Sequence, residues 1–288
     1  MHFQIVDTES AYRRLLAAPD AAAREAIFSR ALIEPFDGLV QFFGGDGPAV
    51  FAQWGMQPEQ FARDRREEMA ALIDALAAAH AWDRAVQALE KGRAAFAAYA
   101  DQIPLEEVVF GQYVADMSGT TQARGYTGFG GIPGWIMTVY GTADEYNLQR
   151  VEAATVHELH HNVLGAYNGP AAGMVQGTLG DYMVGEGLAE SFAAALYGAD
   201  KIGPWVTEFD ERKLEQTRTV FRDALGVSGF GEMRRYIFGG PDAGLPTYAG
   251  YAIGYRVVQA YLVRTGKGIV EATFVPAETI IRESGFFD

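Results

Sequence analysis

The sequence predicts a predominantly helical α+β fold with a short central sheet and helical N- and C-terminal parts. Three observations support this prediction. The first hundred residues carry apolar side chains at the three- and four-residue spacing of amphipathic helices. A β-prone, glycine-rich stretch follows between Leu105 and Tyr140, and the helical spacing returns from Tyr146 onward. Strands in the middle of a chain, with helices before and after them, are typical of α+β proteins.

The N-terminal third is predicted to consist of helices rich in alanine, whose small side chains let helices pack closely. No pattern in this part indicates chemistry, so residues 1–102 are interpreted as a helical support lobe. Residues 103–288 then form a catalytic domain, or both parts form one continuous two-lobed unit. The predicted N-terminal helical segments are Ser10–Leu16, Ala21–Leu32, Phe61–Ala79 and Trp82–Ala98.

The middle of the chain is predicted to hold the strands. Val108 to Ala115 is β-prone, and the glycine-rich segment Gly125–Gly134 follows. The next run, Trp135–Tyr140, is aromatic and partly β-branched and predicts a strand. Glycines before a strand let the backbone bend or let a ligand approach, but neither GxxxxGK[ST] nor GxGxxG is present. The strand Trp135–Tyr140 is either an ordinary sheet strand or a cleft wall that pairs with an extended peptide.

Helices return after the strands. The first is predicted from Tyr146 to Leu164, with Thr142 or Asp144 as its N-cap and Gly165 just past its end. No internal repeat or low-complexity linker interrupts this half. The clearest later helices are predicted over Asp181–Tyr197, ending at Gly198, and over Tyr248–Arg264.

Composition restricts the partners and the chemistry. The 288 residues are 49% hydrophobic, enough for a substantial core, and the net charge of −14 disfavours nucleic acid and anionic membrane surfaces as partners. With no cysteine, disulfides, thiolate catalysis and cysteine zinc sites are excluded, so any metal must be held by His, Asp or Glu. The N-terminus does not resemble a signal peptide, and no apolar run approaches the ~18 residues of a membrane helix. We therefore expect a cytoplasmic protein.

The strongest motif is His157-Glu158-Leu159-His160-His161, an HExxH sequence within a predicted helix. Residues four apart on a helix differ by about 40° around the axis, so His157 and His161 present their rings on one face. Two such imidazoles hold one zinc ion, whose bound water has a pKa near ~7. Glu158 lies beside the open coordination position and is predicted to be the general base that activates this water.

Catalytic zinc has three protein ligands, so a third is required. The extended motif HExxHxxGxxH is excluded because Leu164 and Tyr167 stand at its glycine and final histidine positions. A carboxylate from a later helix remains: Glu186 and Glu190 are four apart and share a face. We predict Glu186 as the ligand and Glu190 as the group that holds a histidine ring. Asp181 is the reserve candidate.

Three further residues complete the predicted site. His160 lies about 100° from His161 around the helix, so it either contacts the metal ligands without binding the metal itself or packs in the core. Tyr251 and Tyr255 are four apart, and the neighbouring Gly250 and Gly254 are expected to leave the surface open. Either phenol is a candidate donor for the oxyanion that develops during hydrolysis, and core packing is the alternative.

In these residues the chain resembles the YjaZ-like family of predicted zinc-dependent proteases. The resemblance covers the chain from about Ile103 to its end, through Gly125–Gly134, Val151–His161, Glu186–Glu190, Gly250–Tyr255 and Pro276–Gly285. HExxH combined with Glu186-Gly-Leu-Ala-Glu190 resembles the gluzincin arrangement of two histidines and a distant glutamate. The resemblance implies a gluzincin-like core with one Zn²⁺ per chain, His157, His161 and Glu186 as ligands, and Glu158 as general base.

The predicted function is therefore a zinc-dependent metallopeptidase that acts on a peptide or protein substrate. One alternative is a regulatory module that keeps the zinc site, lacks protease activity and binds a small molecule or peptide. Another is a zinc hydrolase of a non-peptide amide or ester, which would use the same residues. Zinc suits two imidazoles and a carboxylate best, although manganese, cobalt and nickel accept the same donors.

Overall fold

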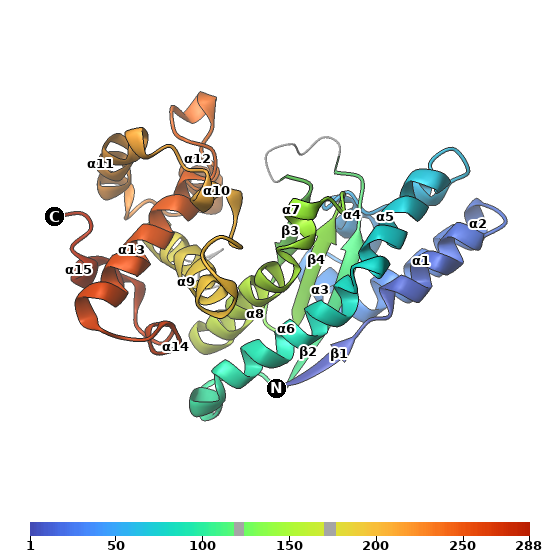
Figure 1. Ribbon diagram of the computed structural model, residues 1–288, viewed down its shortest axis with the longest axis horizontal. Coiled ribbons are helices and arrows are strands. Elements are labelled where there is room, and N and C mark those ends of the chain that lie inside the picture. The colour runs from blue at the N-terminus through green and yellow to red at the C-terminus, as the bar shows by residue number, and fades with distance from the viewer. Residues whose placement is uncertain (118–123, 170–176) are drawn as a thin grey trace. The chain divides into compact units, whose positions relative to one another are not determined.

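The computed structural model describes residues 1–117, 124–169 and 177–288 (Figure 1). By its contacts the chain forms two compact units. Unit 1 comprises Met1–Lys91 and Leu105–Glu158, and unit 2 comprises Gly92–Pro104 and Leu159–Asp288. The division of the chain into domains at residues 102 and 103 stays a prediction.

Unit 1 is built on a four-stranded mixed sheet with the strand order β1-β2-β4-β3. β1 (His2–Ile5), β2 (Glu107–Val114) and β4 (Trp135–Tyr140) are parallel, and β3 (Tyr126–Phe129) runs antiparallel to β4. The α+β prediction is thereby confirmed, as are the strands at β2 and β4. The expectation that strands occur only in the middle of the chain is wrong, because β1 is N-terminal. Four residues are too few to show a period, so only pairing with β2 defines this strand.

The predicted N-terminal helices are present with shifted boundaries, of which two differ most, and two short helices, Asp37–Phe42 and Gly47–Ala52, were not predicted. The helix predicted over Ala21–Leu32 leaves the α conformation at Ser29, where a π-turn leads into a 3₁₀ turn containing Pro35. The helix predicted from Phe61 begins five residues later, after a 3₁₀ turn that starts at Pro58. The helices are α1 (Thr8–Ala17), α2 (Ala21–Phe28), α3 (Asp37–Phe42), α4 (Gly47–Ala52), α5 (Arg66–Ala78), α6 (Ala81–Ala95) and α7 (Glu145–Leu148).

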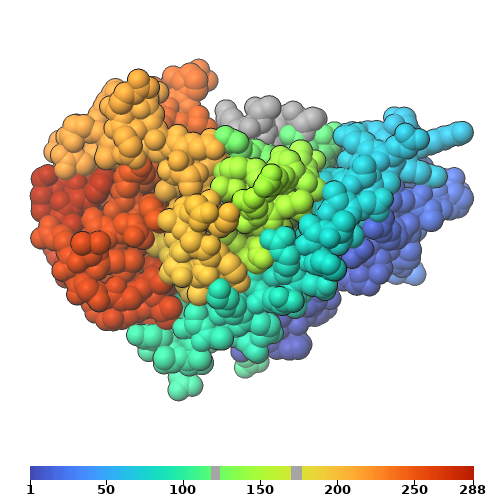
Figure 2. Space-filling view, in the orientation of Figure 1, coloured from blue at the N-terminus to red at the C-terminus, as the bar shows by residue number. Residues whose placement is uncertain are grey.

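Both faces of the sheet are covered. On one face the fully buried ring of Tyr113 packs edge-on against Phe36 and Phe51, and its hydroxyl donates to the Leu32 carbonyl at 2.9 Å. On the other face lies the buried Tyr140, whose pKa is raised first by burial and then by the negative charge of Glu152. In Figure 1, α6 crosses in front of the strands of unit 1, and Figure 2 shows α5 and α6, in turquoise, forming part of the surface on that side. The sheet is thus an interior layer, and its buried residues form the core of unit 1.

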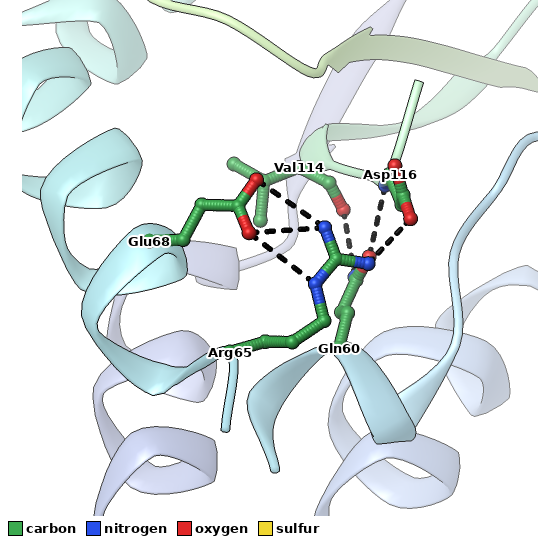
Figure 3. Close-up of polar contacts among 5 residues, drawn as sticks. All are labelled: Gln60, Arg65, Glu68, Val114 and Asp116. Carbon is green, nitrogen blue, oxygen red and sulfur yellow. Dashed lines mark hydrogen bonds and ion pairs between the residues drawn. The ribbon is translucent and has the colours of Figure 1, made fainter. Parts of the chain in front are cut away.

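The carboxyl end of β2 is held by a polar brace (Figure 3). Arg65 pairs with both Glu68 and Asp116, and these two carboxylates raise the pKa of its guanidinium. The Gln60 amide donates to the Val114 carbonyl at 3.2 Å and accepts from the Asp116 N–H at 3.0 Å. These contacts satisfy the carbonyl of Val114, the last paired residue of β2, and the N–H of Asp116 just beyond it, where the strand ends.

The helix predicted over Tyr146–Leu164 is two helices. α7 is capped by Asp144, as predicted, but ends at Leu148, and α8 (Val151–Asn168) continues through Gly165. Arg84 donates to the Leu148 carbonyl at 2.7 Å, so a tertiary contact satisfies the exposed end of α7. α8 ends instead before Gly169, whose φ of +94° suits glycine.

Unit 2 is helical in its described residues, with α9 packed against α13. Its apolar core includes Leu188, Phe221, Ile253 and Val257, each at most 1% exposed. The predicted end of α9 before Gly198 and the predicted helix from about Tyr248 to Arg264 are confirmed. No helix in the described parts of the chain is long and apolar enough to span a membrane. The helices are α9 (Leu179–Tyr197), α10 (Pro204–Thr207), α11 (Leu214–Ala224), α12 (Phe230–Ile237), α13 (Ala249–Thr265), α14 (Ile269–Ala272) and α15 (Ala277–Ser284).

Candidate metal centre

Three of the predicted ligands come together in the structure. His157 and His161 lie one turn apart on α8, and Glu186 lies on α9. Each offers one ligand atom, and these three atoms lie within 4.8 Å of one another. His161 Nε2 and Glu186 Oε2 are 3.3 Å apart. The helical spacing predicted from the sequence therefore brings both rings to the same carboxylate.

The donor set fits zinc. Two neutral imidazoles and one carboxylate supply three ligands, and a catalytic zinc ion keeps the fourth position for water or substrate. His157 is 9% and Glu186 is 6% exposed, and the side chain of His161 is 17% exposed. A carboxylate this deeply buried requires a positive partner, and a divalent ion shared with two imidazoles provides one.

Glu158 lies next to His157 on α8 and is 9% exposed. Strand β3 packs directly against it. A Cβ atom built on Gly128 would overlap the carboxylate end of Glu158, and one built on Gly130 would overlap its backbone carbonyl. Glycine at both positions allows this approach, so the strand backbone and Glu158 are in close contact.

Glu190 is 1% exposed and lies one turn after Glu186 on α9. Its carboxylate accepts a hydrogen bond from the Trp205 indole N–H and another from the Gly203 backbone N–H at 3.3 Å. Gly203 is the N-cap of α10 (Pro204–Thr207) and Trp205 lies within it, so these two hydrogen bonds anchor the start of α10 to α9. The predicted role of Glu190 in holding a histidine ring stays a prediction.

His160 is fully buried in unit 2. Its Nε2 is 3.0 Å from the Thr273 hydroxyl, and its ring packs against Phe96 and Phe192 with centroid separations of 6.1 and 5.5 Å. These surroundings correspond to the packing interpretation of the two that the sequence allowed.

The two candidate tyrosines lie near different carboxylates. Burial, followed by the negative charge of Glu186, raises the pKa of Tyr251 well above its ordinary value of 10.0. Burial and then the charge of Glu190 raise the pKa of Tyr255 as well. Both phenols therefore keep their protons at neutral pH, and Tyr251 is the one influenced by the candidate ligand.

The structure bears on three interpretations of the surroundings of the site: one expectation is wrong, and two alternatives find no support in the described residues. Gly250 and Gly254 do not open a surface, because both are buried: Gly254 lies against the Met183 carbonyl, and Gly250 against the backbone of Ile237. Asp181 is committed to the N-terminus of α9, where it forms a capping box with Thr178. The strand Trp135–Tyr140 is β4, which pairs with strands on both sides and so has no edge for a peptide.

Two features of the site had weak signals in the sequence. The glycine-rich segment indicated a close approach, but not that Gly128 and Gly130 approach Glu158. The same face of the sheet carries Gln112 and Thr138, which are register partners and fully buried. Within the described residues, neither the Gln112 amide nor the Thr138 hydroxyl has a hydrogen-bond partner. The signal available in the sequence was a polar residue, Gln112 or Thr138, inside an otherwise apolar strand, which indicates a polar patch on the sheet.

The fold and the site together define an α+β protein with a buried His/His/Glu group suited to a divalent metal. The chain belongs to the family described as "Predicted Zn-dependent protease (DUF2268)", whose model matches residues 81–282. It is 43% identical over 194 residues to the uncharacterized protein YjfC of Bacillus subtilis (strain 168). That match covers 65% of this chain and 64% of YjfC, so the chain spans less than two thirds of this relative. No solved structure matches the chain significantly.

Proposed function

We propose that this protein is a zinc metallopeptidase of the gluzincin type, with His157, His161 and Glu186 as the ligands of one zinc ion. The convergence of these three ligand atoms within 4.8 Å, with Glu158 next in sequence to His157, is the observation that carries the proposal. Membership in a family described as predicted Zn-dependent protease supports the same class of reaction.

Held by His157, His161 and Glu186, a zinc ion would supply Lewis acidity, which would polarise a substrate carbonyl and lower the pKa of water. The protein supplies the proton transfers. Glu158 accepts a proton from the attacking water and donates it to the leaving amine of the peptide bond. Its close packing against β3 limits the positions of its carboxylate, which favours a fixed geometry for both transfers.

Tyr251 is the proposed donor to the developing oxyanion. Its pKa is raised well above 10.0, first by burial and then by the charge of Glu186, so the phenol remains a hydrogen-bond donor over the neutral and mildly alkaline range. Tyr255 lies near Glu190 instead and is the secondary candidate.

The substrate is proposed to be an extended peptide that pairs with β3. Among the described residues β3 has one strand neighbour, β4, which places it at the edge of the sheet, the position at which an extended peptide adds as a further strand. A peptide added at this edge lies along the same strand whose glycines contact Glu158. The sequence left peptide pairing open for Trp135–Tyr140, and we propose β3 in its place.

The test combines metal content with peptide hydrolysis. We expect about one zinc per chain in the wild type and little in His161→Ala, because a three-ligand site loses one donor. The exposed His80 provides the control, and His80→Ala should keep its zinc. Glu158→Gln should also keep its zinc while hydrolysis falls by about 10²–10⁴-fold, because the amide cannot accept the proton.

Each contrary outcome has a distinct meaning. Absence of zinc from the wild type after reconstitution would refute the metal site. Zinc binding without hydrolysis of any member of a peptide library would favour the binding module. Cleavage only of non-peptide amides or esters would favour the alternative hydrolase.

A further inference from the structure

Two glycines of one strand contact one side chain of the proposed site. Gly128 and Gly130 are two residues apart along β3 and its continuation, so they present the same face, and both lie against Glu158. At Gly128 the atoms that a Cβ would overlap are Oε1, Cδ and Cγ of Glu158, and at Gly130 they are its backbone atoms. One glycine thus borders the carboxylate, and the other borders the turn of α8 that carries it.

The approach is not forced by the backbone conformation. Gly125 and Gly134 have φ values of +75° and +99°, which explains glycine at these positions, whereas Gly128 and Gly130 are not among the residues with positive φ. Glycine inside a strand lacks a side chain to pack and has a high conformational entropy when unfolded. The contact with Glu158 is therefore the physical reason for glycine at positions 128 and 130.

The carboxylate lies on a closed side of the sheet. Gly128 pairs in register with Thr138, which pairs with Gln112, and both of these neighbours are fully buried. Glu158 is itself 9% exposed. A methyl group added at Gly128 would therefore have to shift the carboxylate end of Glu158 from its present position, or shift the strand.

We propose that Gly128 is a positioning residue for the general base: the bare backbone of β3 at this position sets where the carboxylate of Glu158 lies. This inference rests on the proposed function for its catalytic meaning, but the packing that it describes is testable without any substrate. Gly130 acts on the same residue through the backbone of α8 and supports the same placement.

The first experiment is a double-mutant cycle on thermal unfolding, in the chain free of metal. Gly128→Ala should lower Tm by several degrees, whereas Glu158→Ala removes Cγ, Cδ and Oε1, the atoms that the new methyl group would meet. In the Glu158→Ala background the effect of Gly128→Ala should disappear or reverse in sign, because alanine is less costly than glycine in a strand. If Gly128→Ala alone fails to fold, recovery of folded protein in the double variant gives the same result.

Gly111→Ala is the matched control. Gly111 is also a glycine inside a strand of the same sheet, but its Cβ would overlap the ring of Tyr113 on the opposite face. Its destabilisation should therefore be the same in the wild-type and Glu158→Ala backgrounds. The proposal is overturned if Gly128→Ala, like Gly111→Ala, destabilises the wild type and the Glu158→Ala variant by the same amount. Gly128 would then be a structural glycine that is not coupled to Glu158.

The second experiment separates positioning from binding. In the zinc-loaded protein, Gly128→Ala should keep the metal and leave KM nearly unchanged while kcat falls by about 10²-fold, the effect of a displacement near 1 Å. An unchanged kcat in Gly128→Ala would refute the positioning role of Gly128, even if the double-mutant cycle shows that Gly128 and Glu158 are energetically coupled. If neither wild type nor variant hydrolyses peptides, the proposed function fails, and the thermal cycle still decides the packing.

Discussion

The two helices that carry the candidate metal ligands are held close to their neighbours by glycines, but in opposite ways. On α8 the residue at the contact is a large one, Glu158, and the glycines belong to the neighbouring strand. On α9 the glycine belongs to the helix: a Cβ on Gly187 would overlap the Gly254 carbonyl of α13. The first arrangement confines a side chain, and the second brings two helix backbones together.

Because of this difference, we expect changes at the two contacts to affect different properties of the protein, namely its stability and its chemistry. The α9–α13 contact lies in the core of unit 2 and has rigid backbone on both sides, so a change there should affect folding most. The α8–β3 contact lies at a carboxylate, so a change there should affect the placement of a reacting group. Three measurements, from the largest expected effect to the smallest, sharpen or contradict this comparison.

The largest effect is expected on α9. Gly187→Ala should destabilise the protein by about 2–3 kcal/mol, because the methyl group meets the Gly254 backbone and neither helix can yield freely. Gly185→Ala in the same helix is the control, since its Cβ would meet only Leu164 Cδ2 at an ordinary 3.5 Å. That variant should be neutral or more stable by up to about 1 kcal/mol, because alanine favours helix. Denaturant unfolding measures both, and equal effects would contradict the close packing of α9.

A smaller effect is expected where α8 begins. Arg84 donates to both carboxylate oxygens of Glu152 at 2.8 and 2.6 Å, and both side chains are about one quarter exposed. Burial acts to raise the pKa of Glu152, but the hydrogen bonds and charge of Arg84 outweigh it, and the pKa lies below the ordinary 4.5. Glu152→Gln should therefore cost about 1–2 kcal/mol at neutral pH.

The pH dependence of this pair has a definite sign. A depressed pKa in the folded protein means that the stabilisation is present above pH 4.5 and is lost as the pH falls through the lower, folded-state pKa. The stability difference between wild type and Glu152→Gln should thus shrink in acid. A difference that stays constant from neutral pH to strong acid would show that the ion pair does not contribute.

The smallest effect is expected on the face of the sheet beside Glu158. Thr138 is fully buried, and its hydroxyl has no hydrogen-bond partner in the described structure. Thr138→Val keeps the shape and removes the hydroxyl, so the free energy of unfolding should change by less than about 0.5 kcal/mol. Thr138→Ala, which leaves a cavity, is the control and should cost more. A loss above about 1 kcal/mol in Thr138→Val would show that the hydroxyl is hydrogen-bonded in solution.

Local patterns were enough to predict much of this protein. The four-residue spacing of His157 and His161, the β-branched run at β4 and the glycine after α9 each act within a few residues, and each is found in the structure. The absence of cysteine limited any metal site to His, Asp and Glu before the fold was known.

Tertiary structure decided what local patterns left open. Glu186, Glu190 and Asp181 are equally acidic in sequence, and in the described residues it is Glu186 that groups with the two histidines as a possible metal ligand, whereas Glu190 accepts from Trp205 and Asp181 caps α9. Strand β1 is defined by its pairing with β2. The reason for glycine at position 128 is its contact with Glu158, thirty residues away in the sequence. Short-range spacing follows from helix and strand geometry, whereas the partner of a carboxylate or a glycine depends on which segments pack together.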